Sequence, residues 1–194
     1  MADVPADVPA NEPTDPPDDD PVWAAISARR AIRSFQDRPL EPAHLERIIR
    51  AGRRANSSKN LQRWSFIVCR DRAHLRELSA LGPWAGHLAG AAVGIALVTP
   101  DPRAQDAPLS ITFDIGQAAD AMMLAAWELG IGSVPATVYE HDRARELLGY
   151  PAGHHCEYIL SFGYPADPAD LTRPPTSGGR KPLAGLIHEE RWSD

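Results

Sequence analysis

The sequence predicts an α+β domain in which helices and strands alternate around a small sheet. Apolar runs with β-branched or aromatic residues predict strands at Trp64 to Arg70, Ala91 to Thr99 and Glu157 to Gly163. The longest helical pattern covers Asp114 to Leu129 and is followed by Gly130, a common helix stop. Because Ala91 to Thr99 is apolar on both faces, we expect it to be a central strand.

The remaining elements follow from helical spacing and from turn residues. Helices are predicted at 22–30, 41–55, 71–78 and 141–148, and extended chain at 31–37. Asp71 can cap the third of these helices, and Gly149 follows the fourth. A short strand at 133–138 contains Pro135, which cannot donate to a sheet ladder. We therefore expect that strand at an edge or a bend.

The first 21 residues differ in composition from the rest of the chain. They contain six prolines and seven acidic residues but no lysine or arginine, which predicts a disordered acidic tail at 1–21 before a single domain at 22–194. The remaining residues carry 19 acids and 20 bases, so the net charge of −6 belongs to the tail. A nearly neutral body lacks the basic face of a nucleic-acid-binding protein. The role of the tail is left open.

Composition and residue spacing also indicate where the protein is located in the cell and whether it binds a metal. The sequence has neither an apolar run long enough for a membrane helix nor a secretory signal at its N-terminus. The two cysteines lie far apart, and we expect Cys69 to be a buried free thiol in a cytoplasmic protein. His154 and His155 are adjacent and face apart in an extended chain, and no HxH or HxxxH pair occurs. We therefore expect no metal site.

Four segments carry groups that could bind a flat, phosphorylated ligand. Arg29, Arg30 and Arg33 can give paired hydrogen bonds to phosphate oxygens. The polar run 57–63 could form hydrogen bonds with the ring atoms of a buried ligand. Glycines at 130 and 132 allow the backbone to come close to such a ligand, and the segment 178–183 contains two adjacent cations. Each segment alone also fits a plain alternative: a solvated basic face, a polar turn, a helix stop or a solvated pair of cations.

Taken together and in order, these segments resemble the FMN-dependent nitroreductase family over about residues 22–192. A chance match to all of its motifs in sequence is improbable. The matching stretches are RRAIR (29–33), SSKNLQRW (57–64), DIGQAADAMMLAAWELGIGS (114–133), LGY (148–150), FGYP (162–165) and RKPL (180–183).

The resemblance implies a three-layer α/β/α sandwich around a small mixed, mainly antiparallel sheet, in a homodimer with FMN at the subunit interface. It implies that the arginine segment holds the phosphate and ribityl chain, that the serine–asparagine loop reaches the flavin from the other subunit, and that the backbone of 135–137 lies beside the ring. The C-terminal cations would close over the cofactor. The implied FMN-binding residues are Arg29, Arg30, Ala31, Arg33, Ser57, Ser58, Asn60, Gln62, Pro135, Ala136, Thr137, Arg180 and Lys181.

The implied activity is a two-step reaction in which NAD(P)H delivers hydride to the flavin and a small nitroaromatic, quinone or similar electron-poor acceptor is then reduced. We name no catalytic acid or nucleophile, because the flavin supplies the redox chemistry. Two alternatives stay open: the same fold with enone reduction, oxidation or dehalogenation, and a flavin-binding protein without turnover. The stretch Ala118 to Trp127 is apolar almost all round, which favours burial against a twin helix, or else a core helix in a monomer.

The chain departs from the family pattern in three places. Ala31 stands where serine is common, and Arg63 replaces the usual proline before Trp64. The stretch Pro100 to Thr112, which forms a lid in larger relatives, is short and suggests an open pocket. The preference for NADH or NADPH is also left open, because Lys59 and Arg63 could face either a 2′-phosphate or water.

Overall fold

The computed structural model describes residues 21–173 and 180–192. Most of the predicted tail, residues 1–20, lies outside the described residues. The core of the fold is a four-stranded antiparallel sheet in the order β1-β2-β4-β3. A single parallel bridge between Ala31 and Ser133 extends the β3 edge. The strands are β1 (Ser65–Cys69), β2 (Val93–Pro100), β3 (Gly132–Thr137) and β4 (His154–Gly163).

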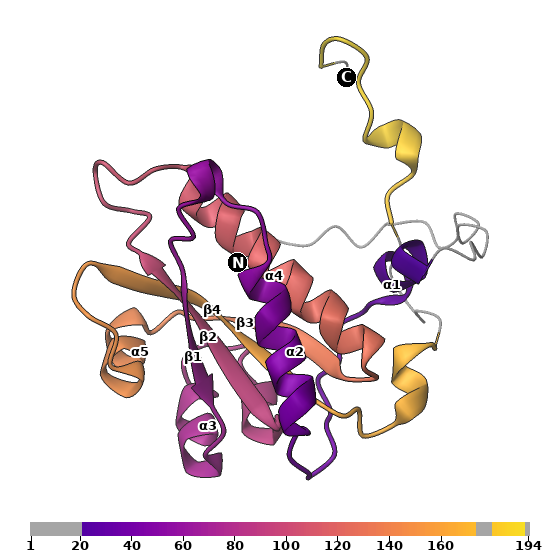
Figure 1. Ribbon diagram of the computed structural model, residues 1–194, viewed down its shortest axis with the longest axis vertical. Coiled ribbons are helices and arrows are strands. Elements are labelled where there is room, and N and C mark those ends of the chain that lie inside the picture. The colour runs from indigo at the N-terminus through magenta and orange to yellow at the C-terminus, as the bar shows by residue number, and fades with distance from the viewer. Residues whose placement is uncertain (1–20, 174–179, 193–194) are drawn as a thin grey trace.

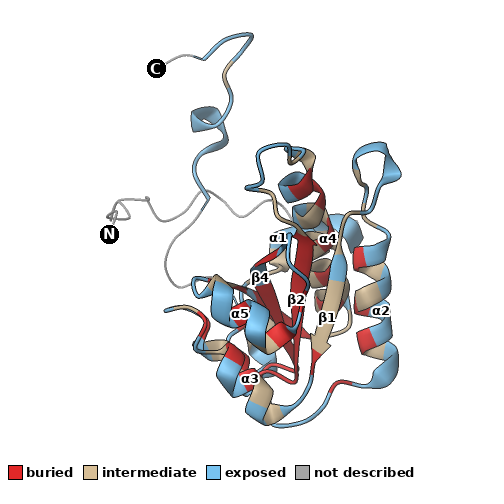
Figure 2. Cartoon of the chain, turned by 90° about the vertical axis from the view of Figure 1, so that its left-hand side faces the viewer, coloured by how far each residue is buried: buried red, intermediate tan, exposed pale blue. Residues whose placement is uncertain are grey.

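Helices cover both faces of this sheet, which gives three layers (Figures 1 and 2). The pair α2 and α4 packs on one face, and α3 and α5 cover the other. Each face therefore has its own apolar core, and the predicted α/β/α arrangement is confirmed. The helices are α1 (Pro21–Ala28), α2 (Pro42–Arg53), α3 (Arg72–Leu78), α4 (Ser110–Glu128) and α5 (His141–Leu148), with 3-10 turns η1 (Ser58–Asn60), η2 (Gly86–Gly90), η3 (Pro168–Leu171) and η4 (Leu183–Gly185).

Local sequence signals explain several of these elements. Strand β2 is buried along nearly its whole length and lies between β1 and β4, as its two apolar faces predict. Strand β3, which contains Pro135, is at the sheet edge. The Asp71 side chain accepts a hydrogen bond from the His74 amide and caps α3. Gly149 ends α5 in the left-handed conformation, with φ of 68°.

Several predicted boundaries differ from the structure. Helix α1 ends at Ala28, so Arg29 and Arg30 lie beyond it. Helix α2 ends at Arg53, so Ala55 lies beyond it. Helix α4 begins at Ser110, one turn before Asp114, since residues 110–113 contain no glycine or proline to prevent helix formation. Strand β4 begins at His154, because its pairing with β2 continues past a register shift at Leu97/Val98 as far as Pro100.

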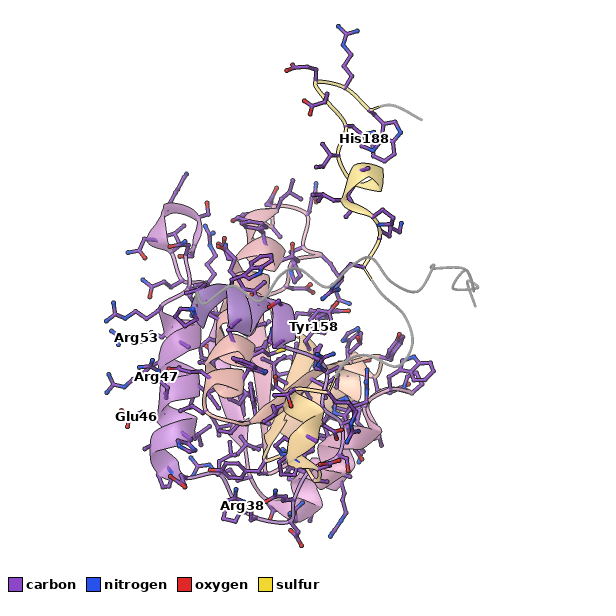
Figure 3. All side chains as sticks on the ribbon, turned by 90° about the vertical axis from the view of Figure 1, so that its right-hand side faces the viewer. Arg38, Glu46, Arg47, Arg53, Tyr158 and His188 are labelled. Atoms are coloured by element: carbon purple, nitrogen blue, oxygen red, sulfur yellow. The ribbon has the colours of Figure 1, made fainter. Side chains whose placement is uncertain are left out.

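Helix α4 is buried along one stripe rather than all round. Its buried residues follow a spacing of three or four, at Ile111, Asp114, Ala118, Met122 and Ala126. The side of the same helix away from the sheet stays partly open, and Phe113 is 71% exposed. Helix α2, which packs beside α4, directs Glu46, Arg47 and Arg53 outward (Figure 3). Within the described residues, no helix combines the length and apolar character that spanning a membrane requires.

Candidate functional site

The arginine segment runs beside the outer edge of β3. The Ile32 amide donates to the Ser133 carbonyl over 3.1 Å, and Ala31 forms a bridge with Ser133. The approach is close because Gly132 has no side chain: a Cβ there would lie 2.6 Å from Ile32 Cβ. Two of the predicted groups, the arginines and the β3 backbone, are therefore neighbours in the fold.

The three arginines of this segment have different surroundings. One terminal nitrogen of Arg29 donates to Asp120 Oδ1 over 2.5 Å, and the other lies 3.8 Å from Met123 Sδ. The Nε atoms of Arg29 and Arg30 are buried and have no hydrogen-bond partner. Arg33 is exposed. A buried guanidinium donor without an acceptor is costly, so both Nε atoms mark a place where an anionic ligand would be stabilised.

The β3 edge leaves a backbone donor pointing away from the sheet. Ser133 accepts from Ile32 on the side opposite to β4. Because backbone groups alternate along an antiparallel strand, the Pro135 carbonyl and the Thr137 amide face the same outward side, whereas the Ala136 amide faces β4. Pro135 has no N–H, which makes Thr137 the outward-facing donor next along the strand. Within the predicted segment 135–137, Thr137 and not Ala136 therefore presents its backbone amide to a ligand at this edge.

His87 of η2 also lies at this edge, and it was not among the predicted site residues. Its Nδ1 lies 2.8 Å from Ser161 Oγ. Burial lowers the pKa of His87 below its usual 6.5, the positive charge of Arg33 lowers it further, and a hydrogen bond with the Pro135 backbone acts in the opposite direction. The imidazole is therefore held neutral between the arginine segment and the β3 edge. Its position depends on packing between distant segments, so local patterns could not reveal it.

The serine–asparagine loop has an unusual backbone and a buried anchor. Lys59, Asn60 and Gln62 all have positive φ values, between 47° and 55°. Non-glycine residues adopt this conformation at a cost, which surrounding contacts must offset. The Ser58 amide donates to Asp114 Oδ2 over 3.0 Å, and this carboxylate is buried in α4.

Further bonds close the same loop. Ser57 Oγ accepts from the Gln62 amide over 3.0 Å, and the Gln62 side chain donates to Asn60 Oδ1 over 3.1 Å. The Ser58 and Asn60 residues themselves are exposed. Asp114 was not among the predicted site residues; the signal that could have found it is an acidic residue at the start of the most apolar helix.

The predicted groups do not all meet within one chain. The loop contacts α4 at Asp114 and the arginine segment contacts it at Asp120, about 9 Å further along the helix axis. Arg180 and Lys181 are exposed at the start of the C-terminal arm, residues 180–192, which extends away from the sheet and carries His188 (Figures 1 and 3). The structure of one chain thus brings together the arginines and the β3 edge, and leaves the loop and the arm apart.

Comparison with known proteins identifies the fold family. The model of the nitroreductase family matches residues 26–85 and 81–164, which together span most of the described chain. The chain belongs to the nitroreductase family. A relative from Archaeoglobus fulgidus, provisionally named as an NADH dehydrogenase/NAD(P)H nitroreductase, is 34% identical over 172 residues, covering 86% of this chain and 96% of the relative.

Solved nitroreductase structures share the arrangement of layers. A provisionally named NADH dehydrogenase/NAD(P)H nitroreductase from Parabacteroides distasonis superimposes with a TM-score of 0.76 at 26% identity, covering 88% of this chain and 98% of that one. An FMN-dependent nitroreductase from Clostridium difficile R20291 has a TM-score of 0.71 at 25% identity, covering 84% and 96% of the two chains. The nitroreductase fold predicted from the motifs is confirmed.

Proposed function

We propose that this protein is an FMN-dependent oxidoreductase that takes hydride from NAD(P)H and reduces nitroaromatic, quinone or similar electron-poor acceptors in two successive steps at one site. The proposal rests chiefly on the buried, unpartnered Nε atoms of Arg29 and Arg30, in the segment that bridges to the outer edge of β3 at Ser133. It is supported by a solved relative that is named as an FMN-dependent nitroreductase.

The residues at this edge fit the chemical groups of FMN. Arg29 and Arg30 supply charged donors for the phosphate, and Ala31 leaves room where a larger side chain would stand. The outward Thr137 amide can donate to a ring nitrogen of the isoalloxazine, and Pro135 presents an exposed, apolar surface beside it. FMN, when bound, supplies the redox chemistry by accepting a hydride and passing it to the acceptor. The protein binds and orients the ring and keeps His87 neutral nearby.

A second copy of the chain completes the proposed site. Leu109 is 94% exposed, and Leu183, Leu186 and Ile187 of the C-terminal arm are also exposed. Apolar side chains clustered on one segment are typical of an association surface. In a homodimer these residues would be covered, and the Ser57 to Gln62 loop and the Arg180–Lys181 pair of the partner could reach the cofactor edge. Sedimentation of a 21.1 kDa chain at twice its own mass is the expected result.

Cofactor binding tests the arginine assignment directly. The purified protein is expected to be yellow and to release FMN on denaturation. Charge-assisted hydrogen bonds contribute about 1.5–3 kcal/mol each, so Arg30→Ala should weaken FMN binding about ten- to a hundredfold in a fluorescence titration of the apoprotein. Arg143→Ala is the matched control, because Arg143 lies on α5 and is exposed there. A colourless protein that refuses added FMN, or equal affinities in the two variants, contradicts the proposal.

Anaerobic mixing tests the reaction itself. Rapid bleaching of bound flavin by NADH or NADPH, followed by recolouring on addition of a nitroaromatic or quinone, is expected in two separable phases. No bleaching with either nucleotide would instead indicate a flavin-binding protein without turnover. The short connection between β2 and α4, residues 101–109, favours a broadly open acceptor site. If only an enone or a halogenated acceptor restores the flavin colour, reduction of that acceptor becomes the proposed reaction.

A further inference from the structure

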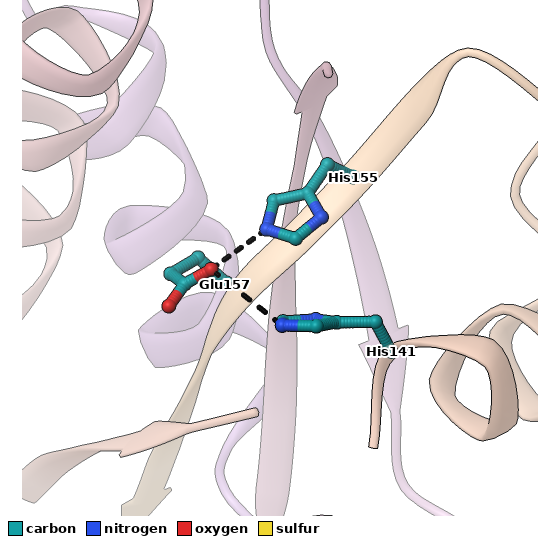
Figure 4. A group of neighbouring side chains, drawn as sticks. All are labelled: His141, His155 and Glu157. Carbon is teal, nitrogen blue, oxygen red and sulfur yellow. Dashed lines mark hydrogen bonds and ion pairs between the residues drawn. The ribbon is translucent and has the colours of Figure 1, made fainter. Parts of the chain in front are cut away.

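Three potential metal ligands meet at the end of the sheet opposite the arginine segment's Ile32–Ser133 contact. His141 is the first residue of α5, and His155 and Glu157 lie on β4, where the register shift against β2 leaves Glu157 out of the pairing and its side chain lies against His155. His155 Nε2 lies 2.7 Å from Glu157 Oε2, and His141 Nε2 lies 4.0 Å from the same oxygen (Figure 4). All three ligand atoms fall within 4.8 Å of one another.

These separations suit a small tetrahedral cation. Zn²⁺ binds imidazole nitrogen and carboxylate oxygen at about 2.0–2.2 Å, which places tetrahedral ligand atoms about 3.4 Å apart. The observed ligand separations of 2.7 Å and 4.0 Å lie on either side of that value. Because Glu157 is half-exposed and His141 is only partly buried, small side-chain rotations can equalise the distances without moving the backbone.

The electrostatic setting also favours a dication. Two neutral imidazoles and one carboxylate carry a net charge of −1. The two imidazole rings lie 4.5 Å apart, so protonating both would place like charges in contact. The nearby cation is Arg103, which is already paired with Asp101 over 3.0 Å. Among the described side chains, His141 also has a buried Nδ1 without a hydrogen-bond partner, a cost that a ligand-driven ring shift could relieve.

The cluster opens onto a cavity. His155 and Glu157 line a pocket of about 340 Å³ together with Thr99, Thr112 and Tyr158. His155 itself is only 3% exposed, so it forms the buried inner side of the cluster. A cation held by three protein ligands would therefore keep its fourth position toward this pocket. Three ligands with an open fourth position are the pattern of zinc sites that bind water or a small anion.

We propose that His141, His155 and Glu157 form a site for a divalent transition-metal ion of the Zn²⁺ type, with one coordination position open to the adjoining pocket. The mixed nitrogen and oxygen donor set suits Zn²⁺ and Co²⁺ better than the hard cations Mg²⁺ and Ca²⁺. Histidine spacing alone does not predict this grouping, because His141 comes from another element and the second residue of the strand pair is a glutamate.

The site is tested by metal titration of the flavin-loaded protein, freed of any histidine tag and treated with a chelator. Calorimetry with ZnCl₂ at neutral pH is expected to show one ion per chain. Co²⁺ should give the visible absorption of a four-coordinate nitrogen and oxygen site. Affinity should fall in acid, because protons compete with the metal ion for the imidazole nitrogens.

Variants distinguish this site from other surface histidines. His141→Ala and Glu157→Gln should each weaken Zn²⁺ binding at least tenfold, since even removing an indirect partner of a metal ligand costs about 10- to 100-fold. His154→Ala is the control, because His154 is exposed and adjacent on the same strand but lies outside the cluster. Circular dichroism and flavin content confirm folding. Failure of the wild type to bind Zn²⁺, or full binding in either cluster variant, overturns the proposal.

Discussion

Replacing Gly132 by alanine should separate the arginine segment from the sheet. The added Cβ would lie 2.6 Å from both Cβ and Cγ2 of Ile32, about 1 Å inside normal carbon contact. Ile32 is buried and β-branched, and its own Cβ cannot rotate away. The two backbones must therefore move apart, which stretches the 3.1 Å hydrogen bond between the Ile32 amide and the Ser133 carbonyl.

The cost can be worked from these contacts. Overpacking costs about 1–3 kcal/mol and a weakened hydrogen bond about 1 kcal/mol, so the free energy of unfolding should fall by about 2–4 kcal/mol. With a urea m value of about 2 kcal/mol/M, the unfolding midpoint falls by about 1–2 M. The assay is urea unfolding of the apoprotein at one fixed protein concentration, followed by circular dichroism.

A second readout connects this contact to the proposed cofactor site. Because the same segment carries Arg29 and Arg30, the Gly132→Ala protein should also bind FMN more weakly. Gly90→Ala is the control: a Cβ at Gly90 meets nothing within 4 Å, so its midpoint should stay close to that of the wild type. Equal midpoints for the two variants would refute the steric reasoning.

Three other predictions concern the core and its titratable groups. A Cβ at Gly52 would overlap Met122, so Gly52→Ala should lower the free energy of unfolding by about 1–3 kcal/mol in the same urea assay. The pKa of His87 is lower in the folded chain than its usual 6.5, so below pH 6.5 the unfolded chain binds more protons than the folded chain. The melting temperature should therefore fall as the pH drops below 6.5, and this fall should be smaller in His87→Gln. Burial raises the pKa of Cys69 to about 11 and of Cys156 to about 12, so both thiols should react with a disulfide reagent only after unfolding; rapid native labelling contradicts this.

Much of the fold follows from local patterns in the sequence. The uninterrupted apolar run of β2 favours a strand covered on both faces, and Pro135 favours an edge or a bend, of which the structure has the edge. No local signal marks the start of α4, because Leu109, which precedes the helix, provides no side-chain cap. Its partly open face could not be distinguished from a fully buried one, since alanine and methionine suit either environment.

The candidate site is only partly visible in the sequence. The arginines and the serine–asparagine loop stand out because charged and polar runs are unusual beside apolar elements. His87 and Asp114 do not, because their roles arise from packing between segments far apart in the chain. The grouping of His141 with His155 has the same origin. The positive φ values at 59, 60 and 62 were also unpredictable, since no glycine marks them.

The composition of the β3 edge has a consequence for solubility before any cofactor is bound. An exposed strand edge is a template on which a neighbouring chain can add its own strand. Here residues 31–33 cover one end of that edge, and the imino nitrogen of Pro135 removes the donor at its centre. An incoming strand would find no continuous ladder to join. The interrupted edge thus also protects the folded chain against edge-to-edge association with a neighbouring copy.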